Sequence, residues 1–227
     1  MKKITVLLAD DHTVVRQGLR ALLESEEDIR VVGEAENGRQ AVHLAKQLQP
    51  DVVILDVAMP LLNGLEANRQ IAREVPSSKV LVLSSYNDDE YVKQVIEEGA
   101  VGYLLKQTAA HDLVKAIREA AKGNAFFSPS ISRRLLQQCR DAFMRGAPAK
   151  KRSDLLTSRE SEVLQLIAEG QANKQIADEL DISIKTVEKH RQQLMSKLDI
   201  HQIAGLVRHA AAQGIIEMNS AGVPVAS

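Results

Sequence analysis

The chain has 227 residues, of which 44% are apolar and 26% are charged, and its formal net charge at pH 7 is −1. These values are typical of a globular protein and exclude a collagen-like, mucin-like or wholly disordered chain. No apolar run approaches the ~18 residues that a membrane helix needs, so we expect no membrane partner. The single cysteine, Cys139, cannot form an internal disulfide, which predicts a cytoplasmic protein.

The first half of the chain alternates between short apolar runs and segments with helical spacing of apolar residues. The five expected strands span residues 4–9, 31–35, 52–55, 80–83 and 101–105, and the five expected helices span residues 14–23, 41–48, 65–75, 91–98 and 113–121. Continuous apolar strands between amphipathic helices are typical of a parallel sheet covered on both faces. Residues 1–122 are therefore expected to form a doubly wound α/β domain with a five-stranded parallel sheet, as in flavodoxin.

The second half is expected to be helical. Residues 123–153 are expected to form a linker, in which a helix is followed by a small, basic, proline-containing hinge at 146–153. Every later periodic segment is helical, and the four expected helices span residues 158–168, 174–180, 184–198 and 202–212. They predict a small all-α domain over residues 154–218, and the patternless tail at 219–227 is expected to be disordered.

Charge is distributed unevenly between these two parts. Residues 1–122 hold 15 Lys and Arg against 19 Asp and Glu, a net charge of −4, whereas residues 123–227 hold 14 against 11, a net charge of +3. An acidic half joined to a mildly basic half indicates two domains with different partners.

Polar side chains stand at the carboxyl ends of four expected strands. Asp10 and Asp11 follow the first strand, Asp56 the third, Ser84 the fourth and Lys106 the fifth. Because the carboxyl ends of parallel strands share one edge of the sheet, we expect these side chains to converge. Carboxylates that lie so close repel one another, and a divalent cation with oxygen ligands relieves that repulsion, which predicts Mg²⁺.

This set of residues suits phosphoryl transfer to a carboxylate. A carboxylate can form an aspartyl phosphate when a metal ion and a cation hold the phosphoryl oxygens. Asp56 is the expected acceptor because it stands alone at the tip of a buried apolar run, whereas Asp10 and Asp11 are adjacent and suited to sharing a cation. Taken singly, each aspartate is equally typical of a helix cap or a loop.

Four segments of the first half resemble the receiver domain of bacterial response regulators. They are VLLADDH at 6–12, VILDVAMP at 53–60, VLSS at 82–85 and GAVGYLLK at 99–106. The resemblance implies that Asp56 accepts phosphate from a histidine kinase. It also implies that Mg²⁺ is held by Asp10, Asp11, Asp56 and the backbone carbonyl of Ala58. By the same resemblance, Ser84 and Lys106 contact the phosphoryl group, and Tyr103 is the aromatic residue of the switch.

The second half contains a candidate helix-turn-helix. A two-turn helix at 174–180 is followed by a tight connection and by a longer helix at 184–198 with a polar face. Two helices joined by a 3–4-residue turn are typical of a motif whose second helix enters the major groove of DNA. On charge alone, the polar face is more typical of a solvated helix than of a DNA-reading one.

The sequence of this segment resembles the LuxR-type helix-turn-helix. The matching motifs are L-T-x-R-E at 156–160, N-K-x-I-A at 173–177 and T-V-x-x-H at 186–190. A receiver followed by this domain is the architecture of the NarL/FixJ family of transcriptional regulators. The resemblance implies base-reading positions at Glu188, Lys189 and Gln192. The residues expected to contact DNA phosphates are Lys174, Lys185, Thr186 and Arg191.

The sequence therefore predicts a response regulator, not an enzyme, whose phosphorylation on Asp56 switches its binding to double-stranded DNA as a homodimer. We expect a closed form in which the receiver masks residues 184–198, with phosphorylation releasing them. One alternative is a phosphohydrolase of the haloacid dehalogenase type, which would carry an aspartate where Ala58 stands. A second alternative is a DNA-binding regulator that acts independently of phosphorylation.

Overall fold

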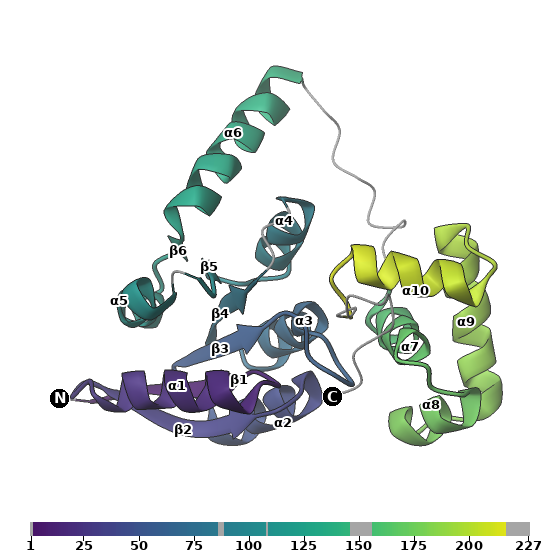
Figure 1. Cartoon of the computed structure of the whole chain (residues 1–227), viewed down its shortest axis with the longest axis horizontal. Helices are drawn as coiled ribbons and strands as arrows, with labels where there is room; N and C mark the ends of the chain where they lie inside the picture. Colours follow the sequence, from purple (N-terminus) through teal and green to yellow (C-terminus); the bar gives the residue numbers. More distant parts are fainter. Residues whose placement is uncertain (1, 86–88, 108, 146–155, 217–227) are drawn as a thin grey trace.

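The computed structural model describes residues 2–85, 89–107, 109–145 and 156–216. One parallel sheet forms the framework of the first half, and its strands run in the order β2-β1-β3-β4-β5-β6 (Figure 1). The strands are β1 (Ile4–Ala9), β2 (Ile29–Ala35), β3 (Val52–Asp56), β4 (Lys79–Ser84), β5 (Gly102–Leu105) and β6 (Phe126–Phe127). This order confirms the expected doubly wound topology, because the direction of winding reverses between β1 and β3.

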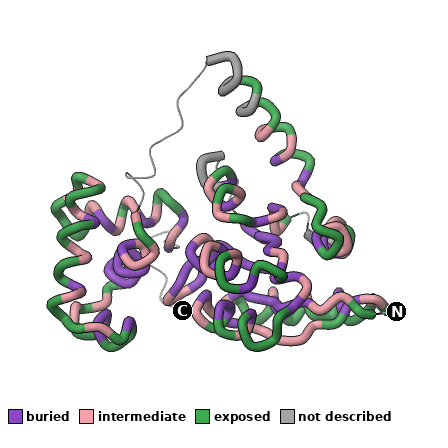
Figure 2. The backbone as a smooth tube through the Cα atoms, turned by 180° about the vertical axis from the view of Figure 1, so that it is seen from behind, coloured by how far each residue is buried: buried purple, intermediate pink, exposed green. Residues whose placement is uncertain are grey.

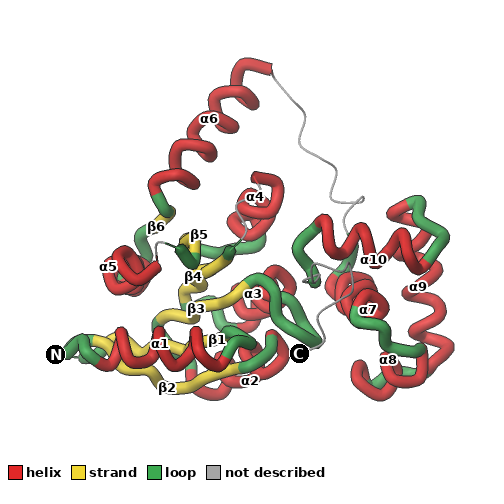
Figure 3. The backbone as a smooth tube through the Cα atoms, in the orientation of Figure 1, coloured by secondary structure: helices red, strands yellow, loops and turns green. Residues whose placement is uncertain are grey.

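Helices cover both faces of the sheet (Figure 3). They are α1 (Thr13–Glu24), α2 (Gly38–Leu48), α3 (Gly64–Glu74), α4 (Asp89–Glu97) and α5 (Ala109–Ala121). Alternate residues of β3 serve the two faces: Val52 and Ile54 pack with α1 and α5, whereas Val53 and Leu55 pack with α2, α3 and α4. Both faces of this strand are therefore buried, which explains its unbroken apolar sequence.

The sheet has one strand more than the sequence predicted. The two residues of β6 extend the edge beside β5, with Phe126 in register with Gly102 and Phe127 with Tyr103. A two-residue strand carries no periodic pattern, so alternation of apolar residues could not identify it. The five expected strands are all present, and the expected number is wrong only because it leaves out this short edge strand.

The second half is helical, as expected. The linker helix α6 (Pro129–Arg145) precedes the four helices α7 (Ser158–Ala168), α8 (Asn173–Leu180), α9 (Ile184–Leu198) and α10 (Ile203–Ala212). A reciprocal pair of hydrogen bonds starts α7: the Thr157 hydroxyl accepts from the Glu160 amide at 3.3 Å, and the Glu160 carboxylate accepts from the Thr157 amide at 2.8 Å. At the start of α9, the Ser183 hydroxyl accepts from the Thr186 amide at 3.1 Å.

The helical part has its own apolar core and lies against the α/β part through one helix. Residues of α7, α8, α9 and α10 form a separate buried cluster. Of these helices, α7 packs against α3, while α9 lies on the far side of α7 (Figure 1). The expected hinge at 146–153 and the expected tail at 219–227 lie outside the described residues. Among the helices that the structure describes, none combines the length and the apolar character needed to cross a membrane.

Candidate functional site

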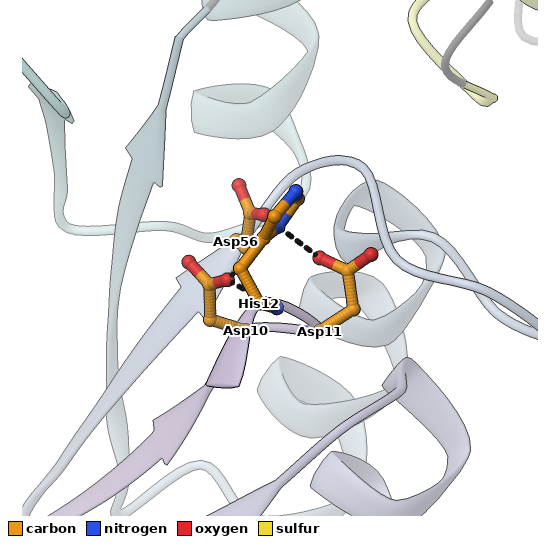
Figure 4. A group of neighbouring side chains, drawn as sticks. All are labelled: Asp10, Asp11, His12 and Asp56. Carbon is orange, nitrogen blue, oxygen red and sulfur yellow. Dashed lines mark hydrogen bonds and ion pairs between the residues drawn. The ribbon is translucent and has the colours of Figure 1, made fainter. Parts of the chain in front are cut away.

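Three aspartates meet at the edge of the sheet where the winding reverses. Asp10 and Asp11 follow β1, and Asp56 is the last residue of β3. One ligand atom from each of these residues and one from His12 lie within 4.8 Å of one another (Figure 4). The parallel pairing of β1 with β3 places the two strand ends side by side, so residues 46 positions apart share one site.

Lys106 joins this group from the end of β5. Its Nζ lies 2.8 Å from Asp10 Oδ2 and 2.7 Å from Asp56 Oδ2, and it bridges the two carboxylates. Ser84, at the end of β4, is fully buried, and its carbonyl accepts from the Lys106 amide at 2.8 Å. Tyr103 is also fully buried, in the core beneath the same edge. The strand ends thus bring together Asp10, Asp11, Asp56 and Lys106 as the sequence predicted.

The charges of the site are strongly coupled. Asp56 is only 3% exposed, and this burial, together with the neighbouring Asp10, raises the pKa of its carboxyl to about 7 against the attraction of Lys106. Burial disfavours the charged form of Lys106, but Asp56 and Asp10 outweigh it and raise the pKa of the ammonium group. Lys106 therefore faces two carboxylates. The net negative charge that results when both are ionised would be reduced by a bound cation.

The donor atoms fit a hard divalent cation. Three carboxylates within 4.8 Å of one another provide the oxygen ligands that Mg²⁺ prefers. Ala58, the other expected ligand, lies two residues beyond Asp56 and is 6% exposed. The sequence reasoning missed His12, whose Nδ1 lies 2.8 Å from Asp11 Oδ1 and 3.4 Å from Asp10 Oδ1. The position of His12 directly after Asp10 and Asp11 in the sequence could have indicated that it lies at the site.

The raised pKa of Asp56 predicts a stability effect that depends on pH. Asp56→Asn is expected to stabilise the metal-free protein, because it removes a buried charge. In the unfolded chain the aspartate ionises near pKa ~3.9, whereas in the fold it ionises at about 7. The stability cost of the charge is therefore absent below about pH 4, grows as the pH rises, and is complete above about pH 7, at roughly 2–4 kcal/mol.

Urea denaturation of both proteins in EDTA, at about pH 5 and about pH 8, measures this difference. We expect the advantage of Asp56→Asn to be larger at the higher pH. Asp178→Asn, which changes an exposed aspartate of α8, is the matched control and is expected to show no such trend. An advantage of equal size at both pH values contradicts the assignment of the raised pKa to Asp56.

The expected DNA-contacting residues gather on and beside α9. Those that are exposed are Lys174, Lys185, Glu188, Lys189 and Gln192. Thr186 is partly buried, and its hydroxyl lies 2.8 Å from that of Ser183 at the start of the helix. Arg191 is also partly buried, and its guanidinium donates to Asn173 Oδ1 at 2.6 Å, which ties α9 to the start of α8.

The expected masking of α9 is wrong for this arrangement. The receiver half contacts α7 and Glu169 directly after it. The Leu61 and Asn63 amides donate to Glu169 and Gln165, and Gln165 donates to the Met59 carbonyl. The polar face of α9 instead points away from the sheet, and exposed residues run along its outer side (Figure 2). The sequence could not predict that α9 stays exposed, because helical spacing does not show which helix of the second half packs against α3.

Comparisons with known proteins match both halves of the chain. The response regulator receiver domain matches residues 6–118, and the bacterial regulatory proteins of the luxR family match residues 154–210. The transcriptional regulatory protein LiaR of Bacillus subtilis is 45% identical over 197 residues, which cover 87% of this chain and 92% of LiaR.

Solved structures give the same result over nearly the whole chain. A structure of the Salmonella typhimurium RcsB response regulator has a TM-score of 0.62 and 32% identity, covering 94% of this chain and 99% of that one. Another, described as two RcsB dimers bound to two parallel DNAs, has a TM-score of 0.57 and 33% identity, covering 93% and 99%. The protein therefore belongs to the NarL/FixJ family of response regulators, which join a receiver domain to a LuxR-type DNA-binding domain.

Proposed function

We propose that this protein accepts a phosphoryl group on Asp56 from a histidine kinase and that the modification increases its binding to DNA as a homodimer. The observation that carries the proposal is the bridge from Lys106 Nζ to the Asp56 and Asp10 carboxylates, at a sheet edge with a third carboxylate in reach. We assign the receiver to residues 1–122, the linker to 123–153 and the DNA-binding domain to 154–218.

In the transfer step, an oxygen of the ionised Asp56 attacks the phosphorus of a phosphohistidine. A P–O bond forms while the P–N bond breaks, and the imidazole keeps the electron pair and takes up a proton. One carboxylate oxygen of Asp56 accepts from the Val57 amide at 2.7 Å, and the other lies 2.7 Å from Lys106 Nζ. These contacts orient the carboxylate and place a cation where negative charge develops.

A magnesium ion at this site would be held by Asp10, Asp11, Asp56 and the Ala58 carbonyl, and would neutralise charge on the phosphoryl oxygens. The three clustered carboxylates support this assignment. Lys106 then pairs with the phosphoryl group. Ser84, buried at the neighbouring strand end, donates a hydrogen bond from its hydroxyl to a phosphoryl oxygen. Tyr103 lies in the core under this edge and moves with Ser84 and Lys106.

On DNA, α9 lies in the major groove. Lys189 pairs with guanine, Gln192 with adenine, and Glu188 accepts from the amino group of cytosine. Phosphate contacts position the domain and come from Lys174, Lys185, Thr186 and Arg191. The structure described as two RcsB dimers bound to two parallel DNAs supports binding as a dimer. Two copies of this protein would then occupy half-sites about one helical turn apart.

A hydrolase function is less favoured. Hydrolases of the haloacid dehalogenase type carry an aspartate as general acid two residues after the nucleophile, and Ala58 stands at that position here. A phosphatase assay with small phosphoesters tests this alternative, and we expect no turnover.

DNA affinity with and without beryllofluoride tests the switch. DNA fragments selected by the beryllofluoride-treated protein are titrated with treated and untreated protein at one fixed salt concentration. We expect treatment to tighten binding about 5–150-fold, the usual range of coupling between two sites. Equal affinity in both states contradicts the proposal and favours the DNA-binding regulator that acts independently of phosphorylation.

A further inference from the structure

An arginine side chain is buried beside the phosphoacceptor site. Arg16 lies at the end of the first turn of α1 and is only 5% exposed. A cation near the start of a helix is opposed by the positive end of the helix dipole, and the burial of its charge adds a further cost. The stability of α1 therefore does not explain an arginine at this position, and the explanation must come from the contacts of its side chain.

The guanidinium group of Arg16 joins the site to the end of β2. Its Nη1 donates to the backbone carbonyl of Asp10 at 2.7 Å. Its Nη2 donates to Glu36 at 2.8 Å, and its Nε lies 3.6 Å from Glu34. A guanidinium group is planar and its N–H groups have fixed relative directions. The two glutamates therefore help to aim Nη1 at the Asp10 carbonyl.

The accepting carbonyl belongs to the peptide group that joins the two adjacent aspartates of the site. Because a peptide group is planar, the direction of this carbonyl fixes the backbone between the α-carbons of Asp10 and Asp11. The pairing of β1 with both neighbouring strands ends at Ala9, and the Asp10 amide donates to the Ala35 carbonyl at 3.1 Å. The peptide group after Asp10 lies beyond that pairing, so Arg16 provides a contact there that the sheet does not.

The carboxylates of the aspartate pair have contacts of their own. Asp10 Oδ1 accepts from the His12 amide at 2.9 Å, and Asp10 Oδ2 lies 2.8 Å from Lys106 Nζ. Asp11 Oδ1 lies 2.8 Å from His12 Nδ1. These contacts orient the side chains, but both carboxylates extend from the backbone that Arg16 holds. A rotation of the shared peptide group would therefore move both of them relative to the acceptor at the end of β3.

Building on the proposed function, we infer that Arg16 is a positioning residue of the metal site, which holds the Asp10–Asp11 peptide group so that both carboxylates face one cation. A guanidinium group has no acceptor atom to offer a metal, so Arg16 acts only through the two aspartates. Glu34 and Glu36 support it from the end of β2.

The sign of the effect on cation binding separates this role from an effect of charge. Removal of a positive charge near the site would by itself strengthen the binding of a cation. Loss of the positioning contact weakens binding instead, since the loss of a hydrogen-bond partner behind a metal ligand typically lowers affinity about 10–100-fold. A role limited to the fold would lower the free energy of unfolding and leave the affinity of the folded protein unchanged.

The experiment compares Arg16→Met and Arg16→Lys with Arg20→Met in the full chain. Arg20 lies one turn further along α1, is half exposed, and pairs with Glu34 at 2.6 Å and with Glu24 at 2.7 Å. Its replacement removes the same charge and the same partner of Glu34, which makes it the matched control. The probe is Mn²⁺, which suits the same oxygen ligands as Mg²⁺, and electron paramagnetic resonance measures the free ion.

We expect Arg16→Met to bind Mn²⁺ about 10–100-fold more weakly than the parent. Arg16→Lys keeps the charge but loses the planar fork, and its affinity is expected to lie between the two. Arg20→Met is expected to bind no more weakly than the parent. Urea denaturation in EDTA measures the stability of each variant separately.

A second readout reports the contact itself in the metal-free proteins. The ¹³C resonance of the Asp10 carbonyl, observed through the Asp11 amide, moves upfield when the carbonyl loses a hydrogen bond. We expect this change in Arg16→Met and not in Arg20→Met.

The outcomes that overturn the inference differ in meaning. An Mn²⁺ affinity of Arg16→Met equal to or tighter than that of the parent overturns it, whatever the stability of the variant, and so does an unchanged Asp10 carbonyl resonance. If Arg16→Met does not fold, Arg16→Lys decides: weaker binding supports the inference, and an affinity equal to that of the parent overturns it. Failure of the parent to bind Mn²⁺ overturns the proposed metal site itself, and the inference with it.

Discussion

Replacing Asp56 with alanine is expected to abolish labelling of the protein by radioactive acetyl phosphate. The reason is that the other two carboxylates of the site are not equivalent to it. Asp56 alone is the last residue of a fully buried strand, with one oxygen fixed by the Val57 amide and the other facing Lys106. Asp10 is the second partner of Lys106, and Asp11 interacts with His12, so both are placed to hold a cation beside the acceptor.

The measurement is the amount of acid-stable and base-labile label per protein after incubation with Mg²⁺. Asp178→Ala, at an exposed aspartate of α8, is the matched control and is expected to label like the parent. Chelation of Mg²⁺ is expected to remove labelling from the parent as well, since three carboxylates then face the incoming anion with Lys106 alone. Persistent labelling of a folded Asp56→Ala protein would refute the assignment of the acceptor.

The sheet and its polar edge could be predicted from the sequence because each depends on local patterns. The run from Val52 to Leu55 is apolar throughout since both of its faces are covered, and this makes the strand recognisable without any partner. Asp56 then marks where the strand ends. Once parallel strands are recognised, their carboxyl ends must meet, and the site follows from topology alone.

The docking of the two domains could not be predicted in this way. Gln165 is one polar residue in the apolar second half of α7, and sequence spacing does not distinguish a buried amide from an exposed one. Its partners at Met59 and Asn63 are more than 100 residues away, and two of its contacts are to backbone atoms, which carry no side-chain signal. The masking of α9 was inferred from the expected phosphorylation switch, and it fails because a different helix, α7, contacts the receiver.

Two lysines of α9 are expected to act differently on DNA binding, Lys189 through a base and Lys185 through a phosphate. Lys189→Ala is expected to weaken binding to the selected DNA about 5–160-fold and to relax the preference at one base pair, because a bidentate contact to guanine is lost. Lys185→Ala, at the exposed start of the same helix, is expected to weaken binding to all sequences alike. It is also expected to reduce the slope of log affinity against log salt by about 0.9, the effect of one lost phosphate contact.

Both lysines carry the same charge and lie on one helix, so the comparison removes the effect of net charge. Lys122→Ala, which removes an exposed lysine of the receiver, is expected to change neither specificity nor salt slope. Competition between selected and scrambled DNA over a series of KCl concentrations measures both quantities for each variant. If Lys189→Ala lowers affinity for both DNAs equally, its ammonium group contacts phosphate, and the orientation of α9 in the groove differs from the one proposed. In that case the exposed Glu188 and Gln192, one and three positions away on the same helix, become the residues to test for base contact.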